Sequence, residues 1–260
     1  MSQSSAELCQ FLPWDTNLFG VRIARANFHR LTPTTMNQAF QWCQDNAIDC
    51  LYFLAEAEME TIRCAEEHGF RMVDVRVTLE QRLHSESRAL SETGGEFTMR
   101  PAVLSDLPDL KYIARDSYIY SRFYSDPCFP RWACQKLYET WIENSVKGRS
   151  GLVLAAVEPA EGERPEQVLG FLTCEINEPG QGQFGLAGVG PAYRSRGIGR
   201  RLVEKGLSWF SENGVEQVKI VTQGRNLASQ RLFQRAGFIT ASIQFWYHRW
   251  FTPCRPEETA

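Results

Sequence analysis

The distribution of hydrophobic residues along the chain predicts alternating strands and helices. Short apolar runs at residues 152–157, 168–175, 184–189 and 218–222 have the length and composition of buried strands. Between residues 131 and 146, aromatic and aliphatic residues recur at helical spacing instead. This order favours an α/β protein in which helices cover a mixed sheet.

A polar segment divides this pattern into two parts. Residues 84–96 contain turn-forming residues and no hydrophobic period, which predicts a linker. A larger unit at residues 97–250 then begins with a strand and a helix, and a smaller unit at residues 1–83 precedes the linker. Residues 251–260 are expected to form a tail.

The smaller unit repeats part of the larger one. In each unit a strand and a helix lead to a Gly-Phe pair and then to an alternating strand; the pairs are Gly69-Phe70 and Gly237-Phe238. A glycine in the left-handed cap position, with phenylalanine packed behind it, accounts for each pair. We interpret the smaller unit as a truncated copy of the larger one. Two unrelated units that share a common helix cap are the alternative.

Composition limits the classes of partner. With 43% hydrophobic residues, 23% charged residues and a net charge of −3, the chain is typical of a globular protein and unsuited to nucleic acid or an anionic membrane. The first residues are polar and no apolar run approaches membrane-span length, so a cytoplasmic location is expected. The eight cysteines form no C-x-x-C pair, so no metal site is expected. Four of them lie in apolar patterns typical of core residues: Cys43, Cys64, Cys134 and Cys174.

The third of the predicted strands runs into a basic turn that contains several glycines. Arg194, Gly197 and Gly199 have the spacing Arg-x-x-Gly-x-Gly, and an amphipathic helix follows directly. Backbone N–H groups at a helix start have no partners within the helix, and glycine lets a ligand approach them. With Arg196 and Arg200 nearby, three arginines are expected to need a counter-charge there. The pattern predicts a phosphate site and differs from the G-x-G-x-x-G and Gly-Lys-Ser/Thr motifs.

This strand, turn and helix resemble the pyrophosphate loop of the GNAT superfamily of acetyl-CoA-dependent N-acetyltransferases. The resemblance implies a mixed, mostly antiparallel central sheet flanked by helices, preceded by a smaller degenerate GNAT-like α/β domain, with acetyl-CoA as cosubstrate. The residues that it assigns to the cofactor come from the strand, the turn and a later helix: Leu186, Ala187, Val189, Arg194, Ser195, Arg196, Gly197, Ile198, Gly199, Arg200, Asn226 and Arg231. For Asn226, a helix N-cap is the alternative role.

The resemblance also gives expectations about catalysis. The backbone N–H of Val189 is the expected donor to the thioester oxygen. The family places a tyrosine, which protonates the departing thiolate, where this chain has Phe233. Tyr247 is a candidate acid in its place, with Tyr193 and water as alternatives. His248 lies among aromatic and basic residues and is assigned to packing.

Three further stretches, at residues 12–21, 121–126 and 141–148, resemble the dTDP-fucosamine acetyltransferase family. That family N-acetylates a dTDP-linked 4-amino-4,6-dideoxy sugar. The aromatic loop at residues 121–130 contains an arginine, and these residue types suit a diphosphate and a thymine base. The predicted substrate residues are Arg122, Phe123, Tyr124, Asp126 and Glu175, the last as a base that acts through water.

Two other functions fit the same loop. One is a GNAT enzyme that acetylates another small amine or a protein amino group. The other is an acyl-CoA-binding sensor without chemistry, which the phenylalanine at position 233 favours. The sequence specifies no oligomeric state.

Overall fold

A ten-stranded sheet runs through the whole molecule. The computed structural model describes residues 8–83, 96–160, 162 and 165–253, and its strands lie in the order β1-β2-β3-β10-β4-β9-β8-β7-β6-β5. Among the described strands only the pairs β2–β3 and β8–β9 are parallel, so the sheet is mixed and mostly antiparallel, as predicted. The strands are β1 (Cys9–Phe11), β2 (Ile23–Ala26), β3 (Cys50–Glu56), β4 (Arg71–Arg82), β5 (Thr98–Pro101), β6 (Leu152–Glu158), β7 (Gln167–Glu178), β8 (Gln181–Val189), β9 (Gln217–Gln223) and β10 (Ile239–Trp250).

Helices pack against this sheet in three groups. The helices α3 and α4 pack with β1, β2 and β3, α8 and α9 pack with β6 to β9, and α2, α5, α6 and α7 lie together near the junction of the two units. Their bounds are α2 (Pro13–Phe19), α3 (Pro33–Asp45), α4 (Met59–Glu67), α5 (Leu107–Ser117), α6 (Arg122–Ser125), α7 (Arg131–Asn144), α8 (Ile198–Glu212) and α9 (Leu227–Arg235). Short turns of helix are η1 (Leu104–Asp106), η2 (Ser145–Arg149) and η3 (Pro191–Tyr193). A mixed sheet flanked by helices was predicted, and the structure confirms it.

The internal repeat has a structural counterpart. Helix α4 leads to β4, and helix α9 leads to β10, with a left-handed glycine between helix and strand in both cases: Gly69 at φ 77° and Gly237 at φ 97°. The N–H groups of Phe70 and Phe238 each donate to a helix carbonyl, at 3.0 Å. The two units therefore end in the same helix cap and the same kind of long strand.

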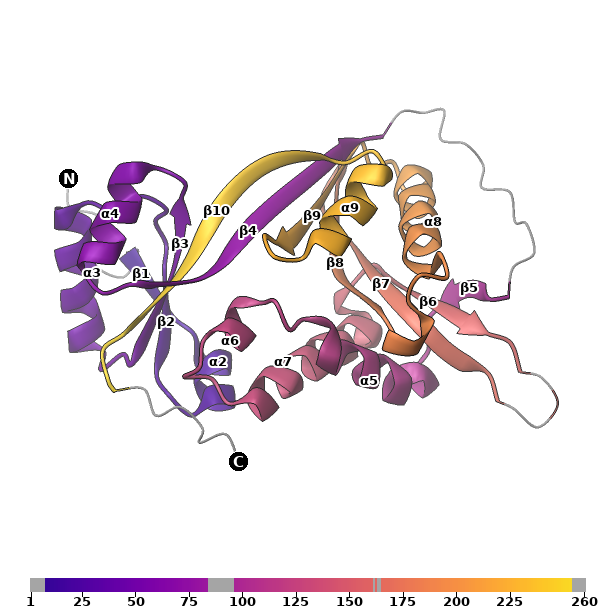
Figure 1. Ribbon diagram of the computed structural model, residues 1–260, viewed down its shortest axis with the longest axis horizontal. Coiled ribbons are helices and arrows are strands. Elements are labelled where there is room, and N and C mark those ends of the chain that lie inside the picture. Colours follow the sequence, from indigo (N-terminus) through magenta and orange to yellow (C-terminus); the bar gives the residue numbers. More distant parts are fainter. Residues whose placement is uncertain (1–7, 84–95, 161, 163–164, 254–260) are drawn as a thin grey trace.

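The two units exchange these last strands. Strand β10 of the larger unit lies between β3 and β4 of the smaller one, and β4 pairs on its other side with β9 (Figure 1). At the centre of the exchange, Arg76 Nη1 donates to Gln244 Oε1 at 3.2 Å, and the two residues are 168 positions apart in the chain. Each unit thus supplies a strand to the other, and the sheet is continuous across the junction.

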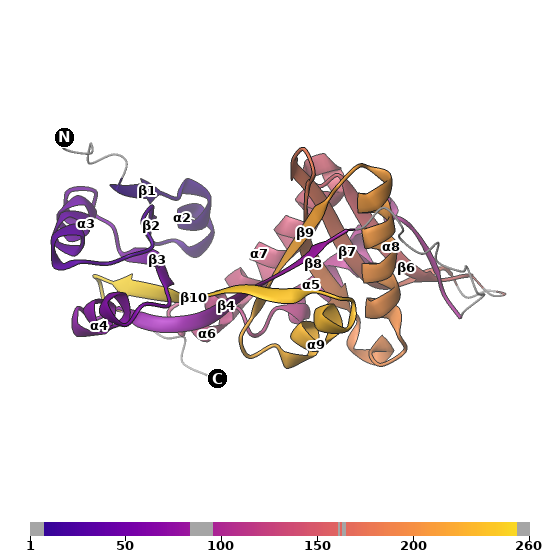
Figure 2. The ribbon, with the colours of Figure 1, turned by 90° about the horizontal axis from the view of Figure 1, so that it is seen from above.

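A hydrophobic core near the junction contains residues of both units. Phe19 of α2 stacks on Phe123 of α6, and its ring centroid lies 4.2 Å from that of Phe129. Tyr52 of β3 contacts the same two rings edge-on. Helices α2, α6 and α7 accordingly lie side by side under the long strands in Figure 1, and Figure 2 shows the same molecule from above.

Several expectations about the rest of the chain meet the structure only in part. The four cysteines expected in the core are buried and free, which confirms that prediction: Cys43, Cys64, Cys134 and Cys174. The expected linker lies outside the described residues except for Glu96, and most of the expected tail also lies outside them, so the division into two domains stays a prediction. Within the described part of the chain, every helix is too short or too polar to cross a bilayer.

Candidate active site

The parallel strands β8 and β9 separate part-way along their length. Their pairing ends at Phe184 and Ile220, although both strands continue. At that point the register between β7 and β8 also shifts, and the Leu186 N–H donates to Thr173 Oγ1 at 2.7 Å. A Cβ atom at Gly185 would lie 2.6 Å from the same oxygen, so the site requires glycine. The irregularity bends β8 away from β9 and opens a gap between them.

The backbone of β8 faces this gap at alternate residues. The Gly190 N–H donates to Leu169 O at 2.9 Å, in register with the β7–β8 ladder. Because hydrogen-bonded positions alternate along an antiparallel pair, Ala187 and Val189 direct their N–H groups away from β7. The Val189 carbonyl likewise accepts from Arg194 Nε at 3.3 Å. This direction supports the expected role of the Val189 N–H as a donor in the gap.

Helix α8 follows this strand after the turn that contains η3, and the N–H groups at its start lack a side-chain cap. Gly197 precedes the helix at φ 78°, no side chain caps the first turn, and that turn holds no acidic residue. A Cβ atom at Gly197 would meet no atom within 4 Å. Uncapped N–H groups beside open space, reinforced by the helix dipole, form a site for an anion. The residues present therefore fit a diphosphate.

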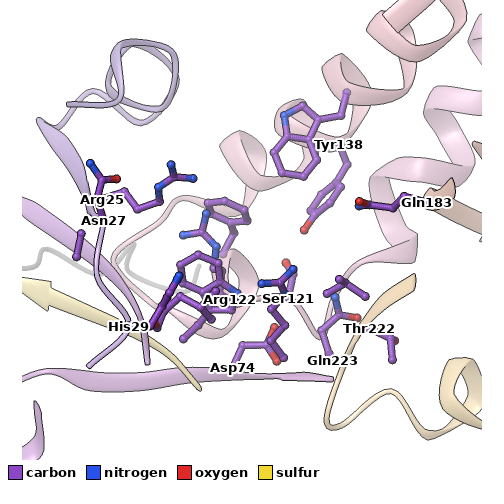
Figure 3. Close-up of a pocket in the computed structure, with 17 residues that line it drawn as sticks. Arg25, Asn27, His29, Asp74, Ser121, Arg122, Tyr138, Gln183, Thr222 and Gln223 are labelled. Atoms are coloured by element: carbon purple, nitrogen blue, oxygen red, sulfur yellow. The ribbon is translucent and has the colours of Figure 1, made fainter. Parts of the chain in front are cut away.

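A cavity of about 600 Å³ lies between the long strands and helices α6 and α7. The smaller unit contributes Arg25, His29, Asp74 and Arg76 to its wall, and the larger unit contributes Arg122 and Tyr138. Figure 3 shows Arg25, His29, Asp74, Arg122 and Tyr138 around the cavity, with the Tyr138 hydroxyl directed inward. Gln183, Thr222 and Gln223 also line it, so the cavity reaches the place where β8 and β9 separate.

Comparisons with known proteins show which family has these separated strands, this turn and this helix. The acetyltransferase (GNAT) family model matches residues 118–238, which include the separated strands, the turn and helices α8 and α9. The chain contains a GNAT acetyltransferase domain. It is similar to the dTDP-fucosamine acetyltransferase of Escherichia coli, with 23% identity over 239 residues, which cover 92% of this chain and 96% of that protein.

Two further proteins are similar to this chain. The spore coat polysaccharide biosynthesis protein SpsD of Bacillus subtilis is 25% identical over 154 residues, or 59% of this chain. The match spans 51% of SpsD, so the chain covers about half of that protein. A GCN5-related N-acetyltransferase from Sphaerobacter thermophilus superposes with a TM-score of 0.64 at 18% identity, covering 95% of this chain and 77% of that one. This last likeness shows the GNAT fold.

Two arginines of the GNAT turn form ion pairs with carboxylates of the protein itself. Arg196 forms ion pairs with Glu96 at 2.9 Å and with Glu158 at 3.3 Å, and Arg200 pairs with Glu204 one helical turn further on. The prediction that all three arginines need a counter-charge from a ligand is therefore wrong for these two. The carboxylates come from distant segments and from the next turn of the helix, which the local motif does not show.

Around α9 the structure places three of the residues named from the sequence. Asn226 caps this helix, since its Oδ1 accepts the Ser229 N–H at 3.1 Å, which confirms the N-cap alternative. The cap uses only the oxygen of the side-chain amide. Arg231 is exposed on the same helix. Phe233 is buried against Phe184 and brings no hydroxyl group to this part of the GNAT domain.

Asp74 is the functional candidate that the sequence did not suggest. Asp74 lines the cavity and is 9% exposed, and its buried Oδ1 has no hydrogen-bond partner among the described residues. Burial raises the pKa of Asp74 to about 7. The sequence signal that could have suggested Asp74 is an acidic residue within the alternating strand that follows Gly69-Phe70. Only the strand exchange, however, brings that strand beside the gap of the GNAT domain.

The residues predicted to contact substrate occupy different places. Arg122 and Phe123 line the cavity. The Tyr124 hydroxyl donates to Arg115 O at 2.7 Å, and Asp126 is buried behind the cavity wall. Glu175 lies on β7 and accepts from Ser150 Oγ at 3.1 Å. The residues that line the cavity therefore do not include Tyr124, Asp126 or Glu175.

The tyrosines considered as acids are also separated by the fold. Tyr247 is 1% exposed and packs against Phe53 and Phe70 in the core of the smaller unit. This placement does not favour the role of a general acid. Tyr193 lines a second, smaller cavity beside η3. Among the described residues, the tyrosine in the wall of the 600 Å³ cavity is Tyr138.

Proposed function

We propose that this GNAT acetyltransferase transfers the acetyl group of acetyl-CoA to the amino group of a nucleotide-linked amino sugar, of the dTDP-4-amino-4,6-dideoxyhexose type. The observation that carries the proposal is the cavity that joins the gap between β8 and β9 to a wall with three arginines. An acceptor with a diphosphate and an amine suits this combination of cations and one carboxylate. The names of the Escherichia coli and Bacillus subtilis relatives support a sugar acceptor.

The donor side of the site binds the cosubstrate through backbone groups. The open start of α8 would bind the diphosphate of coenzyme A, and the side-chain NH₂ of Asn226 would meet its pantetheine arm. When bound, acetyl-CoA supplies an activated acetyl thioester. The N–H of Val189 would stabilise negative charge on the acyl oxygen, because it points into the gap where that oxygen must lie.

The acceptor side of the site supplies a base. The acceptor nitrogen attacks only when it is neutral, so the ammonium form must lose a proton. Asp74 lines the cavity, and its pKa of about 7 suits proton transfer near neutral pH. The thiol of coenzyme A, with a pKa of roughly 8.5, leaves as a thiolate without an acid on α9.

A screen of amines tests the proposed function. Release of free thiol from acetyl-CoA is followed with dTDP-linked and UDP-linked amino sugars, with the free sugars, and with a lysine peptide. We expect acetyl-CoA-dependent turnover with a nucleotide-linked amino sugar that exceeds turnover with the free sugar. Equal turnover of a lysine peptide would instead support a protein acceptor. Binding of acetyl-CoA without thiol release above hydrolysis would support the sensor.

A further inference from the structure

Arg122 is held in the cavity wall by three aromatic rings. Its guanidinium carbon lies 4.1 Å from the ring centroids of Tyr52 and Phe123, and 4.3 Å from that of Trp246. The three rings come from β3, α6 and β10, so both units contribute. Stacking on these faces restricts the guanidinium and removes water from around it. The position of Arg122 is therefore fixed before any ligand binds.

Behind Arg122 lies a histidine whose hydrogen-bonding role is determined by its two neighbours. His248 is completely buried, and its Nε2 lies 3.2 Å from Arg122 Nη1. Since a guanidinium only donates, this nitrogen must accept, and the proton must be on Nδ1. There it donates to Asp126 Oδ2, at 2.6 Å. Burial lowers the pKa of His248 to about 4, so the ring is neutral near pH 7.

The carboxylate at the far end of this chain of hydrogen bonds is itself fixed. Asp126 accepts from the Trp250 indole at 2.9 Å and from the Cys128 N–H at 3.0 Å, in addition to His248. Burial disfavours its ionisation, but these hydrogen bonds together lower the pKa of Asp126. The aspartate therefore stays ionised and keeps the histidine in one tautomer.

This arrangement differs from that of other arginines in the protein. Arg100 and Arg200 contact a carboxylate directly, each at 2.7 Å, and much of their charge is compensated there. Arg122 instead meets a neutral ring, and the nearest carboxylate along this chain lies one imidazole further away. Such a partner orients the guanidinium but does not neutralise it. Among the described residues, Asp15 and Asp74 interact electrostatically with Arg122 but form no ion pair with it.

We propose that His248 and Asp126 are positioning residues that hold Arg122, free of a direct ion pair, for the diphosphate of the acceptor. The inference rests on the proposed function and adds to it. Neither positioning residue touches the acceptor. Their effect is on binding of the anionic part of the acceptor, and they leave the binding of acetyl-CoA unchanged.

Calorimetry with dTDP tests the proposal on the full-length protein. Saturating coenzyme A is present throughout, so that the probe cannot occupy the start of α8. His248→Asn keeps a group that can donate to Asp126 but loses the acceptor for Arg122, and we expect dTDP to bind about tenfold more weakly. His248→Gln places an oxygen near the position of Nε2 and is expected to restore most of that affinity. Acetyl-CoA affinity, unchanged in both variants, reports correct folding.

The possible outcomes distinguish failure of the proposed function from failure of the positioning role. No binding of dTDP to the wild-type protein would overturn the proposed function and the role of Arg122 with it. Wild-type affinity for dTDP in His248→Asn, with acetyl-CoA bound normally, would overturn the positioning role alone. If that variant does not fold, nitrogen NMR of the wild-type imidazoles decides. The proposal requires the Nδ1–H tautomer for His248 at pH 7, and the Nε2–H tautomer would contradict it.

Discussion

At the scale of single residues, the site depends on side chains whose ordinary properties are changed by burial. Asp74 is a carboxylic acid that the cavity keeps partly protonated near neutral pH, and His248 is an imidazole that the core keeps neutral. Neither property can be read from the sequence, because each depends on strands that lie far apart in the chain. Arg122 and Phe123, by contrast, were predicted from an aromatic loop and do line the cavity.

Replacement of Asp74 should reduce catalysis and change its pH dependence. We expect Asp74→Asn to lower kcat/KM by ~10²–10⁴-fold, the usual value of a general base. The wild-type pH profile of kcat/KM should show an acid limb near pH 7 that the variant lacks. Tyr247→Phe, in the core of the smaller unit, is the matched control and should keep close to wild-type activity. An unchanged acid limb in Asp74→Asn would assign the base to another group.

The same substitution should stabilise the protein at high pH. The pKa of Asp74 is higher in the folded chain, about 7, than its usual value of 3.8, so its contribution to stability is lost as the pH rises through 7. The melting temperature of Asp74→Asn should therefore exceed that of the wild type more at pH 8 than at pH 4, by about 2–4 °C per kcal/mol. Glu178→Gln, at an exposed strand end, should show no such trend. A constant difference at both pH values would contradict the raised pKa of Asp74.

At the scale of elements, local patterns predicted a strand, a turn and a helix that the structure contains. A strand, a basic glycine turn and an amphipathic helix are contiguous in the chain, and α8 begins at Ile198, directly after the predicted turn. The partners of Arg196 and Arg200 were not predicted. For Arg196 they come from Glu96 and Glu158, which only the folded sheet brings close.

Gly197 allows a test in which charge is the only difference. We expect Gly197→Asp to weaken acetyl-CoA binding at least tenfold relative to Gly197→Asn, because a carboxylate would face the diphosphate at the start of α8. Both side chains meet open space and bear the same strain at φ 78°. Calorimetry with acetyl-CoA measures the two affinities. Equal affinities of the two variants would contradict binding of the diphosphate at the start of α8.

At the scale of the whole molecule, the exchange of β4 and β10 makes the acceptor cavity a shared structure. The repeated Gly-Phe caps predicted two related units, but a repeat does not specify which strands pair. That choice depends on contacts between segments far apart in the chain, such as Arg76 and Gln244. Because of it, residues from the first part of the chain line a cavity that reaches the gap of the GNAT domain.

The exchange predicts that the smaller unit cannot fold by itself. A fragment of residues 1–83 lacks β10, which separates β3 from β4 and carries Tyr247 into the local core. We expect the fragment to show the circular dichroism of an unfolded chain under conditions in which the full-length protein is folded. A fragment with a cooperative melting transition would show that the smaller unit does not depend on the strand it receives.

A structure that locates the bound acceptor would test the proposed function most clearly. A crystal structure with coenzyme A and dTDP-4-amino-4,6-dideoxygalactose should place the diphosphate against Arg122 and the amino group within hydrogen-bond distance of Asp74. The sugar would then lie between the two units, at the opening between β8 and β9. A sugar bound outside this cavity, for example beside Tyr193 in the smaller one, would contradict the account.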